Sequence, residues 1–99
     1  MRIGTTPTHT FTLPADLASM AKKVRVVYSQ LGTVALTKDV TELTDNSVVL
    51  TLTQEDTLKF HNKKPICIQL RVLTDGGDAM TSDIMTIDPY ACLERCVFK

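Results

Sequence analysis

The sequence predicts an all-β fold, a small immunoglobulin-like antiparallel β-sandwich of about six or seven strands with one or two short helical turns. Threonine and valine, which favour extended backbone, recur along the whole chain, and no amphipathic pattern of helix length interrupts them. Short alternating runs follow one another at regular spacing, with turn residues between them. The chain contains no tryptophan, which argues against the antibody family proper but not against the sandwich. A small barrel is the alternative architecture.

Three alternating runs predict the strands of the first half of the chain, at residues 8–14, 22–29 and 33–40. Gly32 supplies the turn between the second run and the third. The segment between the first two runs predicts a single helical turn that Asp16 can cap. Side chains expected to face the core are Phe11, Leu13, Val24, Val26, Tyr28, Val34 and Leu36.

The second half predicts a strand at 47–53, a central strand at 66–72 and a closing strand at 80–87. Residues 53–56, Thr-Gln-Glu-Asp, match a capping box, so 53–60 is expected to be a short helical crossover between the two sheets. Turns are expected at Thr44–Ser47 and at Asp75–Asp78. Side chains expected to face the core are Val48, Leu50, Leu52, Leu58, Phe60, Ile66, Ile68, Leu70 and Val72.

The chain has 99 residues, enough for one domain, 1–99, with an N-terminal arm at 1–8 and a C-terminal tail at 90–99. Its 11 basic and 11 acidic residues give a formal net charge of zero. Because phosphate backbones and anionic lipids attract basic proteins, nucleic acid and membranes are excluded as favoured partners. No apolar run approaches the roughly 18 residues of a membrane span, and residues 1–14 lack the apolar stretch of a signal peptide. We therefore expect synthesis and assembly in a cytoplasm.

The three cysteines indicate reduced thiols. Cys67, Cys92 and Cys96 cannot all pair within one chain, and there is no export signal to favour oxidation. Cys92 and Cys96 are neighbours at helical spacing, but a structural zinc site needs about four thiol or imidazole ligands. We interpret these residues as packed or incidental thiols.

Other residue types that carry chemistry also lack the spacing of a site. Asp75, Asp78 and Asp83 do not follow a calcium-loop pattern, so the Gly-Gly pair between the first two predicts a hairpin turn. His61 lies in a polar stretch before a strand and is interpreted as a loop residue rather than a base for Cys67. Glu55 and Asp56 are explained by helix capping. The sequence predicts no catalytic, cofactor-binding or metal-binding residue, no small-molecule substrate and no enzyme.

Four segments carry a resemblance: "MRIGTTPTHTFTLP", "KKVRVVYSQ", "LTLTQEDTLKF" and "IQLRVLTDGGDAMTSDIMTI". Together they resemble a family of small proteins encoded among the virion-structural genes of tailed bacteriophages that infect gut Firmicutes. The layout is also similar, at the level of pattern, to the immunoglobulin-like N-terminal domain of phage baseplate upper proteins, in which a comparable hairpin closes the sandwich. The resemblance implies a structural role in a phage particle, with other phage structural proteins as partners, and it brings no site residue.

Two functions follow as hypotheses. The first is a multi-copy structural module of the virion, located at the capsid surface as a decoration or in the tail or baseplate. The second is a small binding module that recognises a host-surface carbohydrate or protein, as immunoglobulin-like folds do elsewhere. For the first, the apolar residues of the tail, Leu93, Val97 and Phe98, are the predicted interface, expected on one side of a helical segment.

We expect the double substitution Cys92→Ser and Cys96→Ser to leave both the fold and the metal content unchanged, because too few ligands are near for a zinc site. Elemental analysis and circular dichroism of the purified variant measure both properties. Stoichiometric zinc in the unmodified chain that disappears in the variant would contradict the interpretation.

Overall fold

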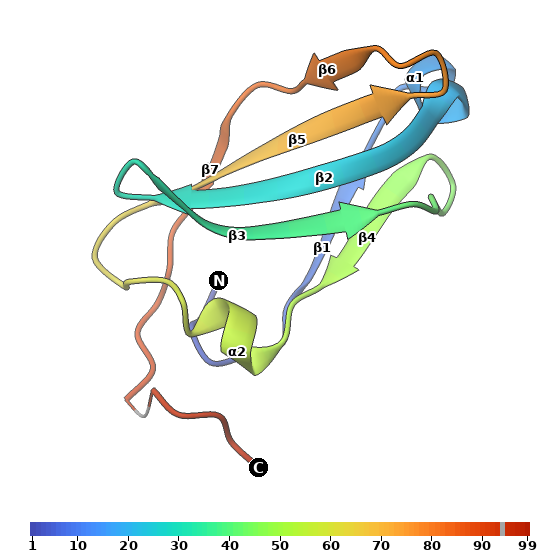
Figure 1. Cartoon of the computed structure of the whole chain (residues 1–99). Coiled ribbons are helices and arrows are strands. Elements are labelled where there is room, and N and C mark those ends of the chain that lie inside the picture. Colours follow the sequence, from blue (N-terminus) through green and yellow to red (C-terminus); the bar gives the residue numbers. More distant parts are fainter. Residues whose placement is uncertain (94) are drawn as a thin grey trace.

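Seven strands and two short helices follow one another in the computed structural model, which describes residues 1–93 and 95–99 (Figure 1). The elements are β1 (Thr8–Thr12), α1 (Ala15–Met20), β2 (Ala21–Gln30), β3 (Thr33–Val40), β4 (Ser47–Thr51), α2 (Gln54–Thr57), β5 (Ile66–Thr74), β6 (Ala79–Thr81) and β7 (Met85–Ile87). All strand pairings are antiparallel. The all-β sandwich class expected from the sequence is confirmed.

The strands form two sheets. The smaller sheet pairs β1 with β4, and the larger has the order β3-β2-β5-β6, with β7 also pairing with β5. This arrangement corresponds to strands B and E facing strands C′, C, F and G of an immunoglobulin-type sandwich, without strands A and D. Because the sheets stay separate, the alternative of a closed barrel is wrong.

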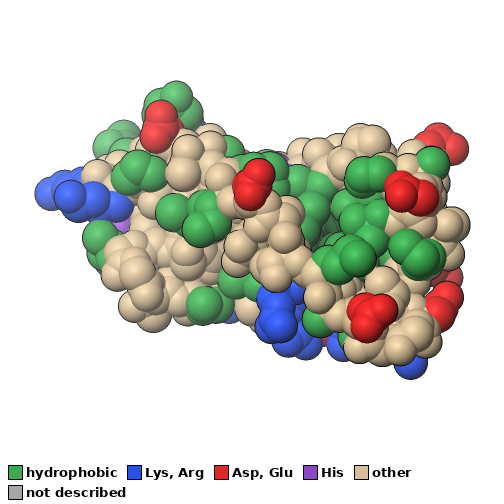
Figure 2. Space-filling view, turned by 90° about the horizontal axis from the view of Figure 1, so that it is seen from above, with side chains coloured by type: hydrophobic (Ala, Val, Ile, Leu, Met, Phe, Trp, Pro, Cys, Tyr) green, Lys and Arg blue, Asp and Glu red, His purple; other side chains and the backbone are tan. Residues whose placement is uncertain are grey.

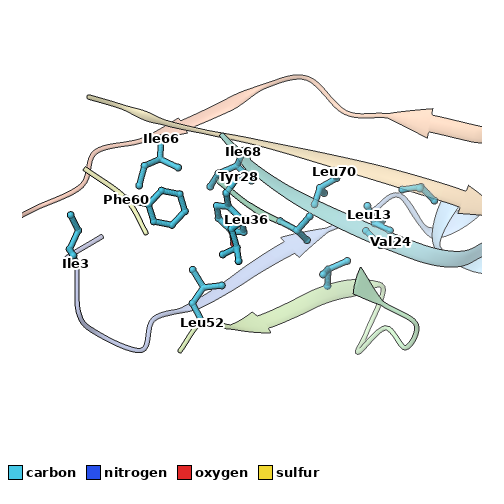
Figure 3. Packing of buried hydrophobic residues seen from close by; sticks show 13 residues of the cluster. Ile3, Leu13, Val24, Tyr28, Leu36, Leu52, Phe60, Ile66, Ile68 and Leu70 are labelled. Carbon is cyan, nitrogen blue, oxygen red and sulfur yellow. The ribbon is translucent and has the colours of Figure 1, made fainter. Parts of the chain in front are cut away.

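Alternating apolar residues of both sheets fill the space between them (Figure 3). In β2 and β5 the inward residues are almost fully enclosed, as expected for the two central strands of the larger sheet. Tyr28 and Phe60 are the bulkiest members, with ring centroids 6.0 Å apart. The buried core consists of Ile3, Leu13, Val24, Val26, Tyr28, Leu36, Val48, Leu52, Phe60, Ile66, Ile68, Leu70 and Val72.

For one residue, the expectation of a core position from the alternation is wrong. Val34 is 58% exposed, although Leu36, two residues later, is buried. The register between β2 and β3 shifts after the pair Tyr28–Leu36, because Ser29 pairs with Val34 and leaves Ala35 as an extra residue. The extra residue puts Val34 and Leu36 on opposite faces of β3, which turns Val34 to the solvent.

The closing strand is interrupted, whereas the sequence predicts one continuous run. β6 and β7 pair with opposite ends of β5, and Ser82 occupies the gap between them. Its hydroxyl accepts the N–H of Leu70 at 2.9 Å, and its own N–H donates to the Leu70 carbonyl at 2.9 Å. The side chain of Ser82 therefore replaces a backbone group of the ladder, and this edge of the larger sheet is made of two short pieces.

The helices are capped differently. Pro14 occupies the cap of α1 without a side-chain hydrogen bond, so Asp16 is not the cap but a residue of the first turn. For α2 the predicted capping box is present: the Thr53 hydroxyl accepts the Asp56 N–H, and the Asp56 carboxylate accepts the Thr53 N–H. Asp56 also pairs with Lys38 of β3 at 3.1 Å, which ties the crossover to the larger sheet.

Both predicted turns are present, but only the second joins two paired strands. Asp45 and Asn46 have φ of 49° and 61°, as in a type I′ turn, and this turn leads from β3 in the larger sheet to β4 in the smaller one. In the Asp75–Asp78 turn Gly77 has φ of 87°, and the N–H of Thr74 donates to the Asp78 carbonyl at 2.9 Å. Glycine at position 77 is favoured because other residues rarely adopt this conformation.

We expect Leu70→Ala to lower the free energy of unfolding by about 2–5 kcal/mol, because it removes buried methyl groups and leaves a cavity. Gln69→Ala on the opposite face should cost only about 1 kcal/mol, since it removes one hydrogen bond, to the Ser82 carbonyl. Urea denaturation of the two variants measures the difference. Equal losses would contradict the register of β5.

Candidate interaction surfaces

The two ends of the chain lie side by side. The N–H of Ile3 donates to the Tyr90 carbonyl at 2.9 Å, and the N–H of Tyr90 donates to the Met1 carbonyl at 2.8 Å. The N-terminal ammonium donates to the Asp88 carbonyl, and Ile3 is completely buried in the core. The expectation of an N-terminal arm at residues 1–8 is therefore wrong, because this segment completes the sandwich.

Thr57 and Gly4 join these ends to α2. The buried hydroxyl of Thr57 accepts the N–H of Gly4 at 2.9 Å and lies within donating distance of the Thr5 carbonyl. Gly4 has φ of 84°, and a Cβ at this position would come within 3.2 Å of the Cys92 sulfur. Because this φ is strained for other residues and an added Cβ would crowd the sulfur, glycine at position 4 favours the close packing of the tail here.

The C-terminal tail lies extended against its own domain. The Arg95 guanidinium donates to the carbonyls of Leu58 and Phe60 at 2.9 and 2.8 Å. The Gln54 side chain makes two further bonds, donating to the Phe98 carbonyl and accepting the Phe98 N–H. The structure has no helix in the described part of 90–99, so the expectation of one helical side is wrong.

The three predicted interface residues differ in how far they are exposed to solvent. Leu93 is fully exposed and Phe98 is 80% exposed, whereas Val97 is half-buried. Val97 lines a hollow of about 440 Å³ beside α2, together with Thr6, Thr51, Leu52, Thr53, Gln54 and Glu55. We call Leu93, Val97 and Phe98 the terminal surface. It presents two exposed apolar side chains, and hydrogen bonds of Gln54 hold the backbone of Phe98 in place.

A second surface, the outer face of the larger sheet, is basic. Lys23, Arg25 and Arg71 line a hollow of about 180 Å³ with Val72, Leu73 and Ala79. Asp39 pairs with Arg25 at 2.7 Å and with Lys23 at 3.2 Å. The hydrogen bond from Arg25 is the main reason that the pKa of Asp39 falls to about 2. These exposed pairs fix side-chain positions and contribute little to stability.

Two buried polar contacts were not predicted from the sequence. The Gln30 amide donates to the carbonyls of His61 and Lys64 and accepts the His61 N–H, which holds the loop before β5. His9 Nδ1 lies 2.7 Å from the Tyr28 hydroxyl, between the sheets. Burial, with a smaller contribution from the N-terminal charge, lowers the pKa of His9.

The residues with candidate chemistry lie apart. His61 is exposed in the loop after α2, Cys67 is half-buried in β5, and Asp75 and Asp78 belong to the hairpin turn. Among residues 1–93 and 95–99 no three of the His, Cys, Asp and Glu side chains are grouped so that they could hold a metal ion. Of the two helices described, neither has the length and apolar character that a membrane crossing requires.

Comparison with known proteins finds no matching family model, no matching curated protein and no matching solved structure.

We expect the free energy of unfolding to fall between pH 7.5 and pH 5 because of His9. The pKa of His9 is lowered in the folded protein, so the unfolded chain, with a value near 6.5, binds protons first as the pH falls. The His9→Gln variant should therefore lose less stability over this window, measured by urea denaturation at both pH values. His61→Gln removes an exposed histidine and is the control. If His61→Gln reduced the pH-dependent loss of stability as much as His9→Gln, a specific role for His9 would be contradicted.

Proposed function

We propose that this chain is a structural subunit of a bacteriophage particle. In this role it is a non-enzymatic module that packs in multiple copies against neighbouring subunits, at the capsid surface or in the tail or baseplate. The segments that resemble virion-structural proteins support the particle as its location. They include β2, the α2 crossover and the β5–β6 hairpin, which together form the framework of the sandwich.

The terminal surface is the observation that carries the proposal. Leu93 and Phe98 are exposed although burial of each side chain is worth about 1.5–3 kcal/mol. At the same time Arg95 and Gln54 hold the backbone of the tail against α2 and the loop that follows it. Because these bonds already fix Phe98, a partner that covers its side chain gains the burial at a reduced entropic cost of ordering this end of the chain.

Recognition of a host-surface carbohydrate or protein is the second candidate, and Tyr90 is the observation that favours it. Tyr90 is 55% exposed, and sugars stack on exposed aromatic rings. However, the Arg2 guanidinium lies 5.6 Å from the ring centroid and covers one of its faces. The other tyrosine, Tyr28, is buried in the core. We therefore favour assembly over carbohydrate recognition.

We expect the double substitution Leu93→Ser and Phe98→Ser to prevent incorporation into particles without affecting folding. Both side chains are exposed in the isolated domain, so the urea midpoint should stay at its original value. Loss of about 3 kcal/mol or more of burial at the interface corresponds to docking weakened by about a hundredfold. Immunoblots of purified particles of the encoding phage measure incorporation.

Leu31→Ser is the matched control, because Leu31 is a 61% exposed leucine on the β2–β3 turn. This variant should be incorporated like the unmodified chain. Point substitutions are preferable to deletion of 90–99, which would also remove the pairing of Tyr90 with Met1 and Ile3. Normal incorporation of the double variant, or absence of the unmodified chain from particles, would contradict the proposal.

A further inference from the structure

Part of the inner face of the larger sheet is uncovered. Met80 pairs with Val72 and Met85 pairs with Ile68, and cross-strand partners point to the same face of a sheet. Val72 and Ile68 are only 4% and 3% exposed, yet Met80 and Met85 are 45% and 37% exposed. We call these two methionines the uncovered strip. They face the interior of the sandwich at a place where no strand of the smaller sheet lies over them.

The strand of the smaller sheet next to this strip is β1. The residues that lead into β1 run beside Asp88–Tyr90, which directly follow β7. In contrast, β4 follows β3 through the tight turn at Thr44–Ser47, and Asp56, which follows β4 in the chain, pairs with Lys38 of β3. In Figure 1, β1 accordingly lies behind β4. The uncovered strip is therefore bordered by the free edge of β1.

The backbone of β1 presents unused hydrogen-bonding groups at this edge. The N–H of Leu52 donates to the Pro7 carbonyl and the N–H of Leu13 donates to the Asn46 carbonyl, each at 2.9 Å. Because bonded pairs alternate in an antiparallel ladder, odd-numbered residues of β1 bond to β4 and even-numbered ones point away. The N–H and C=O groups directed to the free edge belong to Thr8, Thr10 and Thr12.

Other edges of the two sheets carry features that discourage strand addition. β3 has a bulge and the charged pair Lys38 and Asp39, and the β6–β7 edge is short and interrupted. The first residue of β4 is already bonded to Thr44. Within Thr8–Thr12 there is no bulge, no proline and no acidic or basic residue apart from His9. The β1 edge is thus open to another strand.

The residues around the uncovered strip in the sequence also indicate the charge that a binding segment should carry. Residues 72–93 contain no lysine or arginine. The acidic residues of this segment are Asp75, Asp78, Asp83 and Asp88. Figure 2, the view from above, looks onto the outer side of the larger sheet and not onto the strip; acidic side chains lie toward one end of this face, and basic side chains lie nearer its middle. A segment with basic residues would complement the charge of the four aspartates.

We propose that the β1 edge and the uncovered strip bind one extended segment of a neighbouring protein, which adds a third strand to the smaller sheet. Thr8, Thr10 and Thr12 hydrogen-bond its backbone, and Met80 and Met85 contact its alternate apolar side chains. Basic residues of the segment face the aspartates. The segment takes the place of the missing strand A. This inference rests on the proposed function in one respect, which is that the partner is a neighbouring subunit of the particle.

A second copy joined through its own β1 edge does not fit this site. Twofold pairing of the two β1 strands would place both larger sheets on the same side of the joined smaller sheets. The β6–β7 parts of the two copies, which extend beyond β1, would then compete for the same space. A single extended segment does not meet this obstacle.

The test uses the purified full chain and a synthetic peptide, Lys-Val-Thr-Val-Thr-Val-Thr-Lys, as the probe. At a peptide concentration ten times its Kd, amide hydrogen exchange at Thr8, Thr10 and Thr12 should slow by about tenfold. The amides of Val49 and Thr51, on the opposite edge of the same sheet, should be unchanged. The same peptide with glutamate in place of both lysines should bind more weakly.

Thr10→Pro and Val49→Pro form a matched pair of variants. Thr10 and Val49 are cross-strand partners whose N–H groups point to opposite free edges, so neither proline removes a bond within the sheet. We expect Thr10→Pro to abolish peptide binding and Val49→Pro to retain it. Should both prolines unfold the sheet, Met80→Lys tests the same site, because it changes an exposed side chain and should weaken binding while folding is retained.

Protection of Val49 in place of Thr10, binding unaffected by Thr10→Pro or Met80→Lys, or no binding by the unmodified chain would overturn the proposal. Protection of Thr10 that rises with protein concentration in the absence of peptide would identify a second copy as the occupant and would also overturn it. These outcomes do not depend on particles, so failure of the binding site and failure of the proposed function are distinguishable.

Discussion

The pairing of β2 with β5 is the constraint on which the rest of the structure depends. Its register places Val24 opposite Val72 and Val26 opposite Leu70, so the two longest apolar rows share one face of the larger sheet. A slip by one residue would turn either row to the solvent, which fixes the register. β3 can then add only to the free side of β2, and β6 and β7 only to the free side of β5. The smaller sheet covers the face that this pairing creates.

Alternation made most of this arrangement predictable, because the faces of a strand are a local property of the sequence. The bulge at Ala35 could not be predicted in this way, since it depends on which residue of β2 faces which residue of β3. The same holds for Ser82, whose hydroxyl replaces a backbone group only when β5 lies beside it. The burial of Ile3 escaped prediction for a related reason: its partner Tyr90 is far away in sequence, and such pairing leaves no periodic signal.

The candidate surfaces were predictable to different degrees. Leu93 and Phe98 stood out as large apolar residues beyond the last predicted strand, and the structure leaves both exposed. Their spacing indicated a helix, but the bonds from Arg95 and Gln54 to distant parts of the chain hold the tail extended. The free β1 edge could not be found from sequence at all, because an edge is defined by the absence of a neighbouring strand. Tertiary structure alone shows that Thr8, Thr10 and Thr12 direct their backbone groups outward.

In the proposed function, other protein covers the apolar side chains that the sandwich leaves exposed at these two surfaces. A reconstruction of the purified phage particle by electron cryo-microscopy tests this view most directly. The account predicts multiple copies of the domain with Leu93 and Phe98 buried against neighbouring subunits. Absence of the domain from the particle, or its presence with the terminal surface facing the solvent, would contradict the account.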